Sequence, residues 1–394
     1  MSAQRFDVVV AGAGLVGACA ALALARRGMR VALVEATQPV FDNDAEDVSY
    51  DLRVSAISPR SQQILQQLDV WQMLDTERVC YYEQMYIWHQ QGDASIAFDA
   101  LDLARENLGA IVENRQIQCA LHQACHQHSG IDWFIPAHIE ALVENTQQGV
   151  SLQLSTGDRI DAGLLVAADG RNSPTRNLAG IEAHSEGYEQ TALVANVSTE
   201  IDHRHTAWQR FLSTGPLAFL PLANGQSSIV WSCDNRFAQQ LENATDDEFC
   251  EALGEAFEFK LGVVTETSQR LSFPLAWHSC ERWLNNAVVL IGDAAHSVHP
   301  LAGQGVNLGF SDVELLASLV AENSDLRRRK QLRRYERQRK SETWMASKSF
   351  SALKWVYGMD NRAFAGVRDL GMRLVQASPV IKYELVRRAT ENLT

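Results

Sequence analysis

The sequence predicts an α/β fold in which a β-rich segment is inserted into a domain of alternating strands and helices. The chain opens with a β-branched run at 6–10, a glycine-rich turn, a helix-forming stretch and a second apolar run at 31–35. Two later apolar runs, at 164–168 and 287–291, each lead into a loop with an acid and a glycine. Between them, residues 183–275 are rich in strand-like segments and turn signals. Matching signatures on both sides of a β-rich stretch indicate an inserted domain and not two domains in series.

Local signals predict the other elements along the chain. Gly28 ends the first helix, which has helix-forming composition from Ala18 to Arg27. Apolar and β-branched runs predict strands at 151–154, 164–168, 193–198, 208–212, 228–232 and 287–291. Composition and apolar spacing predict helices at 59–68, 115–126, 246–256 and 304–320, and over most of the chain from 326.

The composition is typical of a globular protein, with 394 residues of which 46% are hydrophobic and 21% charged. It excludes a disordered or collagen-like chain. The seven cysteines are an odd number and none forms a Cys-x-x-Cys pair, which indicates reduced thiols and a cytoplasmic location. Asp7 interrupts any signal-peptide pattern, and three glycines in the uncharged stretch 8–25 argue against a membrane span.

The net charge of −13 is unevenly distributed. Between Arg327 and Arg388 there are 17 Lys/Arg and 5 Asp/Glu, a net charge of +12. A basic end on an acidic body is typical of a protein that meets an anionic surface, and equally of solvated helix faces. Apolar residues of the same region, including Trp344, Leu370 and Leu374, predict either packing on the first domain or an interfacial surface. Both interpretations stay open at this point.

The first motif is the glycine-rich turn after the first strand. Gly12 permits a tight turn, Gly14 lets the backbone approach a pyrophosphate, and Gly17 allows the helix to pack closely on the strand. The phosphates would lie at the helix N-terminus, where free amides and the dipole favour negative charge. Glu35, at the end of the second strand, is placed to accept a hydrogen bond from a ribose hydroxyl. Strand, helix, strand and acid together predict a bound dinucleotide.

Two further motifs extend this site. The apolar run 164–168 delivers Asp169 and Gly170 into a loop, and the run 287–291 delivers Gly292 and Asp293. A glycine-rich loop at 303–308 then opens another helix, whose N-terminal amides could hold a developing anion. Two helix N-termini and two strand-end acids suit a long cofactor with a phosphate bridge and a polyol chain. FAD has that shape.

In this order and spacing, the three signatures resemble the class A flavin monooxygenases, the single-component aromatic hydroxylases. DLRVSAIS at 51–58 and HPLAGQGVNLG at 299–309 are similar to the branch of ubiquinone-biosynthesis hydroxylases, as are FLPL at 219–222 and RRYER at 333–337. The resemblance covers most of the chain, and 292–309 is its most specific part. It implies an α/β fold with a Rossmann-type FAD-binding domain, like that of glutathione reductase or para-hydroxybenzoate hydroxylase, an inserted mixed β-sheet substrate domain and a helical C-terminal region.

On this basis we expect the following division of the chain. The FAD-binding domain would comprise 1–72, 99–182 and 276–325, the substrate domain 73–98 and 183–275, and the helical C-terminal region 326–394.

The resemblance also implies roles for individual residues. The FAD pyrophosphate would lie on Gly12, Gly14 and Gly17, and the adenosine ribose on Glu35. The other implied cofactor contacts are Arg53 and Arg115 with the phosphate or ribityl region, Asp169 with FAD and NADPH, Gly292 and Asp293 with the ribityl chain, and Gly305, Val306 and Asn307 with the flavin's pyrimidine edge.

The implied reaction is hydroxylation of an electron-rich phenol. NADPH or NADH binds transiently and reduces FAD, and oxygen then adds to give a 4a-hydroperoxyflavin that transfers OH to the ring. The helix N-terminus after Gly303 would stabilise the anionic reduced flavin, and Pro300 would shape the substrate side through its backbone. The residues implied in catalysis are Pro300, Gly303, Gln304 and Gly305.

No metal site is expected. The histidines and cysteines of 119–128 form a polar helix face, with no second group of ligands nearby in the sequence. His296, just after a strand-end loop, is expected to be structural.

The resemblance implies a polyprenyl phenol of ubiquinone biosynthesis as substrate and O2 as co-substrate, and leaves the hydroxylated ring carbon open. Other ubiquinone-biosynthesis proteins and anionic lipid on the inner face of the cytoplasmic membrane are the expected partners. Nucleic acid is not, and a homo-oligomer stays open. The alternatives are a class A hydroxylase of a small soluble phenol, with Arg or Lys lining its cavity, a flavin-binding assembly subunit that does not turn over, and a non-oxygenating flavin reductase.

Overall fold

A mostly parallel sheet forms the centre of one half of the structure, a computed structural model that describes residues 3–41, 49–90, 93–297, 305–320, 325–358 and 362–390. Its strand order is β18-β19-β11-β1-β2-β8, and β10 and β9 continue from the N-terminal half of β11. β1 lies between β11 and β2 and runs parallel to both. The strands are β1 (Gln4–Ala11), β2 (Val31–Val34), β8 (Ile131–Phe134), β9 (Ile139–Asn145), β10 (Val150–Leu154), β11 (Arg159–Ala167), β18 (Leu284–Asn285) and β19 (Val288–Leu290).

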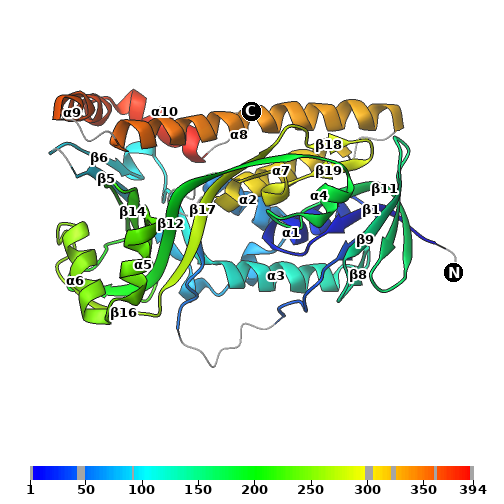
Figure 1. Ribbon diagram of the computed structural model, residues 1–394, viewed down its shortest axis with the longest axis horizontal. Coiled ribbons are helices and arrows are strands. Elements are labelled where there is room, and N and C mark those ends of the chain that lie inside the picture. Colours follow the sequence, from blue (N-terminus) through cyan, green and yellow to red (C-terminus); the bar gives the residue numbers. More distant parts are fainter. Residues whose placement is uncertain are drawn as a thin grey trace.

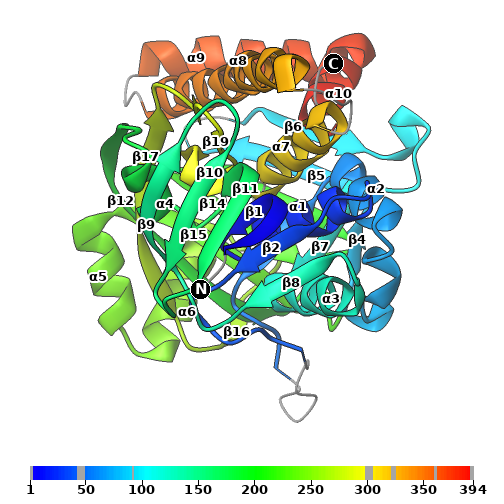
Figure 2. The same ribbon diagram turned by 90° about the vertical axis from the view of Figure 1, so that its right-hand side faces the viewer.

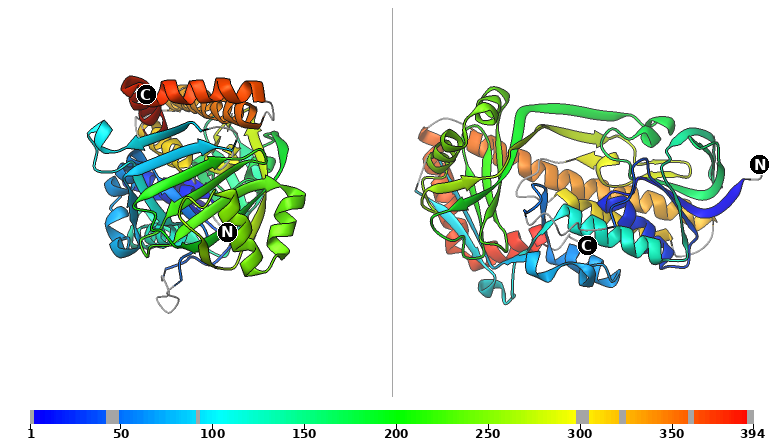
Figure 3. Two further views of the ribbon diagram at one scale, coloured as in Figure 1. Left: turned by 90° about the vertical axis from the view of Figure 1, so that its left-hand side faces the viewer. Right: turned by 90° about the horizontal axis from the view of Figure 1, so that it is seen from below.

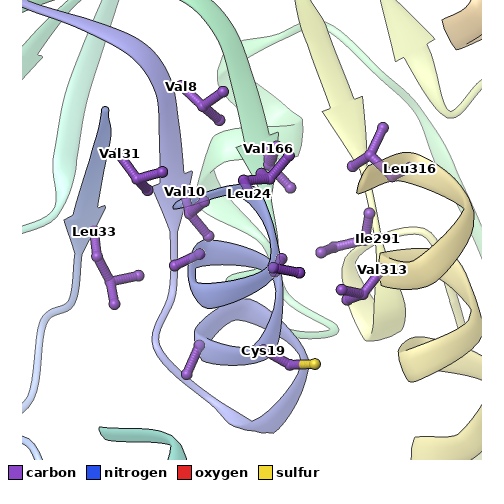
Figure 4. Close-up of a cluster of buried hydrophobic side chains, with 14 of the residues drawn as sticks. Val8, Val10, Cys19, Leu24, Val31, Leu33, Val166, Ile291, Val313 and Leu316 are labelled. Carbon is purple, nitrogen blue, oxygen red and sulfur yellow. The ribbon is translucent and has the colours of Figure 1, made fainter. Parts of the chain in front are cut away.

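Helices cover this sheet, and their composition explains how closely they pack. α1 (Leu15–Ala25) consists of small and aliphatic residues and is buried from Gly17 to its end, as expected of a helix that is apolar on all sides. It contacts α3 (Asn114–Gln127) on one side and α7 (Gly305–Val320) on the other. Figure 4 shows side chains from the strands and from α1 together with Val313 and Leu316 of α7 in this core.

Smaller elements complete this half of the molecule. A three-stranded antiparallel sheet has the order β3-β7-β4. These elements are β3 (Val54–Ile57), α2 (Pro59–Gln67), β4 (Cys80–Tyr82), β7 (Gly109–Glu113) and α4 (Pro174–Leu178). Figure 2 shows the parallel strands with α1, α2 and α3 beside them.

The other half is built on a nine-stranded sheet in the order β20-β17-β12-β15-β14-β13-β5-β6, with β16 paired to β12. The long strands β12 and β17 run from this sheet toward the parallel sheet (Figure 1). α5 and α6 lie on the side of the sheet remote from β1 and α1 (Figures 1 and 3). The elements are β5 (Gln84–His89), β6 (Ser95–Asp99), β12 (Ala183–Thr199), β13 (Thr206–Phe211), β14 (Pro216–Pro221), β15 (Ser227–Asp234), α5 (Asn235–Asn243), α6 (Asp246–Ala256), β16 (Val264–Thr267), β17 (Leu271–Cys280) and β20 (His296–Ser297).

The C-terminal helices extend along one side of both halves (Figure 1). α8 (Asp325–Gly358) packs on α7 and β18, α9 (Arg362–Ala377) packs on the edge strand β6, and α10 (Pro379–Thr390) follows. Asp369 of α9 lies 2.8 Å from Nε2 of the buried His89, and the buried Met372 joins the apolar cluster beside β14. Within the described residues, no helix is long and apolar enough to span a bilayer.

Most predicted elements are confirmed. The helix expected at 246–256 is α6, and those expected at 59–68 and 115–126 are α2 and α3 with ends shifted by one residue. The six predicted strands are β10, β11, β12, β13, β15 and β19, and three of them are much longer than predicted. The described part of the C-terminal region is helical, as predicted. β14 and β17 are among the strands that the sequence analysis did not predict.

Candidate active site

The sequence motifs converge because four parallel strands end at the same edge of the first sheet. β1 ends before Gly12, β2 before Glu35, β11 before Asp169 and β19 before Gly292. Backbone hydrogen bonds extend the strand register into these loops: Gly12 N donates to Val34 O, Ala168 N to Ala11 O and Ile291 N to Ala167 O, at 2.8, 2.8 and 3.1 Å. Ligands of open α/β sheets bind at this edge.

The glycine-rich turn needs its glycines for different reasons. Gly12 has φ of +95°, and a Cβ there would lie 2.6 Å from Ala168 O. A Cβ at Gly17 would lie 2.0 Å from Gly12 O, so only glycine lets α1 approach the turn. Nothing lies within 4 Å of the corresponding position at Gly14. Gly14 precedes a helix with no acidic residue in its first turn, so this space suits a phosphate.

Glu35 is held beside this turn by hydrogen bonds from the chain itself. Its Oε2 accepts from Ala13 N at 2.7 Å, and its Oε1 accepts from the backbone and hydroxyl of Thr37. Burial opposes its ionisation, but these bonds outweigh the effect and hold the pKa of Glu35 below its ordinary value. The carboxylate is therefore charged and fixed at the turn, one strand away from Gly14.

Asp169 organises the second motif. Its carboxylate accepts a short hydrogen bond from the Ser173 hydroxyl and one of 2.9 Å from Thr175 N, at the start of α4. Arg176 reaches back from α4 and donates to Arg171 O at 2.8 Å and to Ala294 O at 3.2 Å. The second motif is thus tied to the loop of the third.

Asp293 lies in the third motif, directly after Gly292, which has φ of +55°. Its side chain is exposed, and no described residue donates a hydrogen bond to it. Desolvation by the surrounding loops raises the pKa of Asp293 above its ordinary value. The interactions with His296, Arg171 and Arg53 lower this pKa but only partly offset the desolvation. Because the side chain is exposed and no described residue donates to it, Asp293 can accept hydrogen bonds from hydroxyl groups of a bound polyol.

Arg53 is positioned by a partly buried ion pair that sequence reasoning missed. Glu113, at the end of β7, accepts two 2.8 Å hydrogen bonds from Arg78 and one of 2.7 Å from Asp51 N. Asn114 N donates to Arg53 O at 2.9 Å. The pair Arg78–Glu113 therefore holds the segment that brings Arg53 toward Asp293. Burial opposes ionisation of Glu113, but the Arg78 bonds hold its pKa below the ordinary value.

The third glycine-rich loop is described only from Gly305 onward. Pro300, Gly303 and Gln304 lie outside the described residues. Asn307 ties the start of α7 to β3, since its Oδ1 accepts from Ser58 N at 3.0 Å and its Nδ2 donates to Ala56 O at 2.8 Å. Val306, beside it, is half-buried at the start of α7.

Arg115 is the remaining predicted cofactor contact. It is exposed in the first turn of α3, after Glu113 and Asn114.

A buried charge cluster, also absent from the sequence analysis, lies behind Gly292. Asp312 of α7 is fully buried and accepts from Gly292 N at 2.9 Å, from His296 Nε2 at 2.7 Å and from Arg339 Nε at 2.6 Å. Although burial opposes its ionisation, His296 and Arg339 hold the pKa of Asp312 below its ordinary value. The His296 ring stacks on Trp283 with 4.8 Å between centroids. Both contacts hold the His296 ring in place behind Gly292.

Arg339 brings α8 into this cluster. It also donates to Leu308 O at 3.0 Å, and its other end forms an ion pair with Glu342. Tyr335, one turn earlier, donates to Leu290 O at 2.9 Å. This face of α8 therefore packs on the half of the molecule that contains the parallel sheet. Such packing is one of the two interpretations that the sequence left open.

A second buried polar group links the two halves of the molecule. His278 of β17 accepts from Arg176 Nη1 at 3.2 Å, so its Nδ1 carries the proton that faces Ser185 Oγ at 3.3 Å. Burial and the neighbouring Arg176 lower the pKa of His278 to about 4. This histidine is neutral at pH 7.

The histidines and cysteines of α3 do not form a metal site in the described part of the chain. His122 instead braces the glycine-rich turn. Its Nδ1 accepts from Val40 N at 3.0 Å, and its Nε2 therefore donates to Ala13 O, 2.6 Å away.

These features together fit a dinucleotide with a polyol chain. Among the described residues, the space beside Gly14 is open and suits the pyrophosphate. The fixed Glu35 suits the adenosine ribose, and Asp293, which receives no hydrogen bond from these residues, suits the polyol. The distance between the first and third motifs is short, because Val16 of α1 packs against both Gly292 and Gly309.

The chain is similar to a known protein family and to several proteins of known activity. The family described as FAD binding domain matches residues 5–349. The chain is 32% identical over 394 residues to the 3-demethoxyubiquinol 3-hydroxylase of Escherichia coli K12, covering 99% of each chain. It is 33% identical to the ubiquinone hydroxylase UbiL of Rhodospirillum rubrum, covering 98% of this chain and 90% of that one. It is 30% identical to the human mitochondrial ubiquinone biosynthesis monooxygenase COQ6, covering 98% and 92%.

Solved structures share the fold at low identity. The p-nitrophenol 4-monooxygenase PnpA of Pseudomonas putida DLL-E4 superposes with a TM-score of 0.77 at 17% identity, covering 98% of each chain. Klebsiella pneumoniae HpxO, solved with FAD and uric acid, superposes with a TM-score of 0.73 at 16% identity, covering 97% and 96%.

The Asp312 cluster yields a first prediction. Asp312→Asn removes the charge that neutralises the buried Arg339, and it removes one of the two carboxylate oxygens that accept from Arg339, Gly292 and His296. We expect the apoprotein to lose about 3 to 5 kcal/mol of unfolding free energy, measured by urea denaturation, and FAD affinity to fall because the Gly292–Asp293 loop loosens.

Glu314→Gln is the matched control on the same helix. It breaks the partly exposed ion pair with Arg60 and should cost no more than about 1 kcal/mol. Equal stability of the two variants would contradict the assigned role of Asp312.

His278 yields a second prediction, on pH. The unfolded histidine has a pKa near 6.5 whereas the folded one has a pKa of about 4, so unfolding takes up a proton between these values. The unfolding free energy of the wild type should therefore fall as the pH drops from about 6.5 to about 4. His278→Gln, which can still accept from Arg176, should flatten this decline in denaturation curves measured across that range. His184→Gln, an exposed histidine of the neighbouring strand, should leave it unchanged. An unaltered slope in His278→Gln would refute the buried neutral state.

Proposed function

Because the chain belongs to the FAD binding domain family, we propose that it is an FAD-dependent monooxygenase that hydroxylates the aromatic ring of a polyprenyl phenol in ubiquinone biosynthesis. The single observation that carries the proposal is the convergence of Gly14, Glu35 and Asp293 at one sheet edge. The space beside Gly14 suits the pyrophosphate of FAD, the fixed carboxylate of Glu35 suits its adenosine ribose, and the exposed carboxylate of Asp293 suits its ribityl chain. Identity of 30–33% over nearly the whole chain to enzymes named for ubiquinone hydroxylation supports the choice of substrate.

Bound FAD, reduced by NADPH or NADH, supplies the activated oxygen for the ring. The chain's own residues bind and orient it. Gly12 and Gly17 shape the turn so that the pyrophosphate would lie beside Gly14 at the N-terminus of α1, and Glu35 would accept from the adenosine ribose. Asp293, to which no described residue donates a hydrogen bond, would accept from the ribityl hydroxyls.

The remaining predicted residues act around this frame. Arg53 lies close enough to Asp293 to lower its pKa and is assigned to the ribityl or phosphate region. We assign the same region to Arg115, and Asp169 to the motif shared by FAD and the nicotinamide. Gly292, Gly305, Val306 and Asn307 complete the flavin side. Pro300, Gly303 and Gln304 keep their proposed role at the reacting edge of the flavin.

The two halves of the fold support a division of labour. The parallel sheet with its three motifs is the proposed FAD-binding domain, formed by 1–72, 99–182 and 276–325. The nine-stranded sheet presents one face toward it and is the core of the proposed substrate domain, 73–98 and 183–275. β4 and β20 cross this division, since β4 pairs with β7 of the other half and β20, from 276–325, pairs with β17. The phenol ring would lie between the two, with O2 as co-substrate. Binding to other ubiquinone-biosynthesis proteins stays part of the proposal.

The function is tested by supplying the FAD-loaded protein with NADPH, isotopically labelled O2 and a phenol that carries a short prenyl tail. We expect a product heavier by one labelled oxygen atom, detected by mass spectrometry. Asp293→Ala should be purified with at least about tenfold less flavin, because the ribityl chain loses its acceptor. Asp132→Ala, which breaks the surface ion pair with Arg30, should retain flavin. Oxidation of NADPH without a labelled product from any phenol would contradict the monooxygenase.

We also propose that the C-terminal helices meet an anionic membrane, where a polyprenyl substrate resides. Leu370 and Leu374 of α9 and Val380 of α10 are 60%, 59% and 77% exposed, although all three are large apolar residues. Arg333, Arg334 and Arg337 are exposed on α8, which lies along the same side of the molecule (Figure 1). Exposed apolar residues beside a basic helix are typical of an interfacial surface.

Replacing Leu370, Leu374 and Val380 together with serine should reduce binding to phosphatidylglycerol vesicles by at least about tenfold, measured by co-sedimentation. Ile201→Ser with Val263→Ser is the control, because these apolar residues are 43% and 50% exposed on the proposed substrate domain, away from α9 and α10. Equal co-sedimentation of both variants and the wild type would show that these helices form a solvated surface and do not bind the membrane.

A further inference from the structure

Two neighbouring side chains with unpartnered polar atoms lie on the nine-stranded sheet. Asn196 of β12 and Ser228 of β15 are opposite each other in the strand register, so both side chains project from the same face. They are only 3% and 1% exposed, and neither Asn196 Oδ1 nor Ser228 Oγ has a hydrogen-bond partner among the described residues. Buried polar atoms normally have a partner, so this pair calls for a ligand or a water molecule.

The face in question is the one turned toward the proposed FAD-binding domain. Ile229 and Trp231, which alternate with Ser228 along β15, pack in the cluster that contains Phe249 of α6. Val230 points the other way and packs in the cluster that contains Tyr50. Since side chains alternate along a strand, Ser228 and Asn196 share the side of Val230, away from α5 and α6 (Figure 1).

Asn196 connects this face to the cofactor-binding segment. Its Nδ2 donates to Tyr50 O at 3.0 Å, which leaves Oδ1 as the unpartnered end of the amide. Tyr50 directly precedes the Asp51–Arg53 segment that Glu113 holds in place. Arg53 in turn lies near Asp293. The unpartnered pair is thus one short segment away from the proposed ribityl site.

The surroundings favour a neutral, oxygen-bearing ring over a charged one. Ser228 pairs in register with Leu220, and the next row of the same face holds Val230 and Ala218. Arg210 of β13 belongs to the opposite face, where it is paired with Glu258. Gln209, opposite Ala218, adds an uncharged amide to this face. A largely apolar wall with neutral polar groups suits a phenol, whereas a ring carboxylate would need a cation here.

We propose that Asn196 and Ser228 bind the phenolic hydroxyl of the substrate and determine which ring carbon faces the flavin. One hydroxyl satisfies both atoms, because its hydrogen is donated to Asn196 Oδ1 while its oxygen accepts from Ser228 Oγ–H. The prenyl tail then lies against the apolar part of the face. This inference rests on the proposed function and specifies how that site selects its substrate.

Ser228→Ala tests the proposal, because it removes only an unpartnered hydroxyl and should not unfold the chain. Binding of 2-geranylphenol to the FAD-loaded protein, measured by isothermal titration calorimetry, should weaken about tenfold. Binding of geranylbenzene, which has no hydroxyl, should not change. The ratio of hydroxylated isomers should also shift, while flavin content and thermal stability stay as in the wild type.

Ser227→Ala is the matched control. Ser227 is the preceding residue of β15 and is equally buried, and its hydroxyl also has no partner among the described residues, but it projects from the opposite face. It should bind both ligands as the wild type does. If Ser228→Ala binds 2-geranylphenol as tightly as the wild type, the pair is filled by water and the inference is wrong. If the wild type hydroxylates no phenol, the proposed function itself fails, and the binding data alone then decide whether the hydroxyl subsite exists.

Discussion

The close approach of backbone segments at the carboxyl edge of the parallel sheet is the constraint on which the rest of the structure depends. A single methyl group at Gly17 would come within 2.0 Å of Gly12 O, and one at Gly309 within 2.4 Å of Val16. Without these glycines, α1 could not reach the first turn and α7 could not reach α1. The first and third motifs, about 280 residues apart in the chain, would then no longer face one cofactor.

The close approach of these backbone segments buries polar groups. Buried carboxylates accept hydrogen bonds from them and form ion pairs with neighbouring cations. Asp312 accepts from Gly292, His296 and Arg339 at the point where α7, α8 and the β19 loop meet. Glu113 plays the equivalent part for the segment of Arg53, through Arg78. Asp312 thus supports the loop of Asp293, and Glu113 supports the segment of Arg53, and both supported residues are assigned to the cofactor. Breaking either pair would leave a buried charge, so these loops have little freedom to move.

How far the sequence could predict the fold depended on whether the signal was local. The capping box at Thr245 and Glu248 marks the start of α6 within the chain itself, and the predicted helix has the observed bounds. β17 was not predicted because Pro274 interrupts its pattern, and its place comes from pairing with β12 some 80 residues earlier. The strand-end acids Glu35, Asp169 and Asp293 could be found by spacing. Asp312, Glu113 and Arg339 could not, since their partners are defined only in the folded chain.

The same distinction explains why the basic C-terminal helix has two characters. Leu332, Tyr335, Arg339 and Thr343 of α8 are buried at helical spacing against the first domain, whereas Arg333, Arg334 and Arg337 between them are exposed. Net charge alone cannot separate these two faces, because Arg339 counts the same in a sum whether it neutralises Asp312 or meets solvent. One face of the helix supports the Gly292–Asp293 loop, and the other is free to meet an anionic surface. A membrane contact on the outer face would therefore act on a helix that is already tied to the cofactor loop.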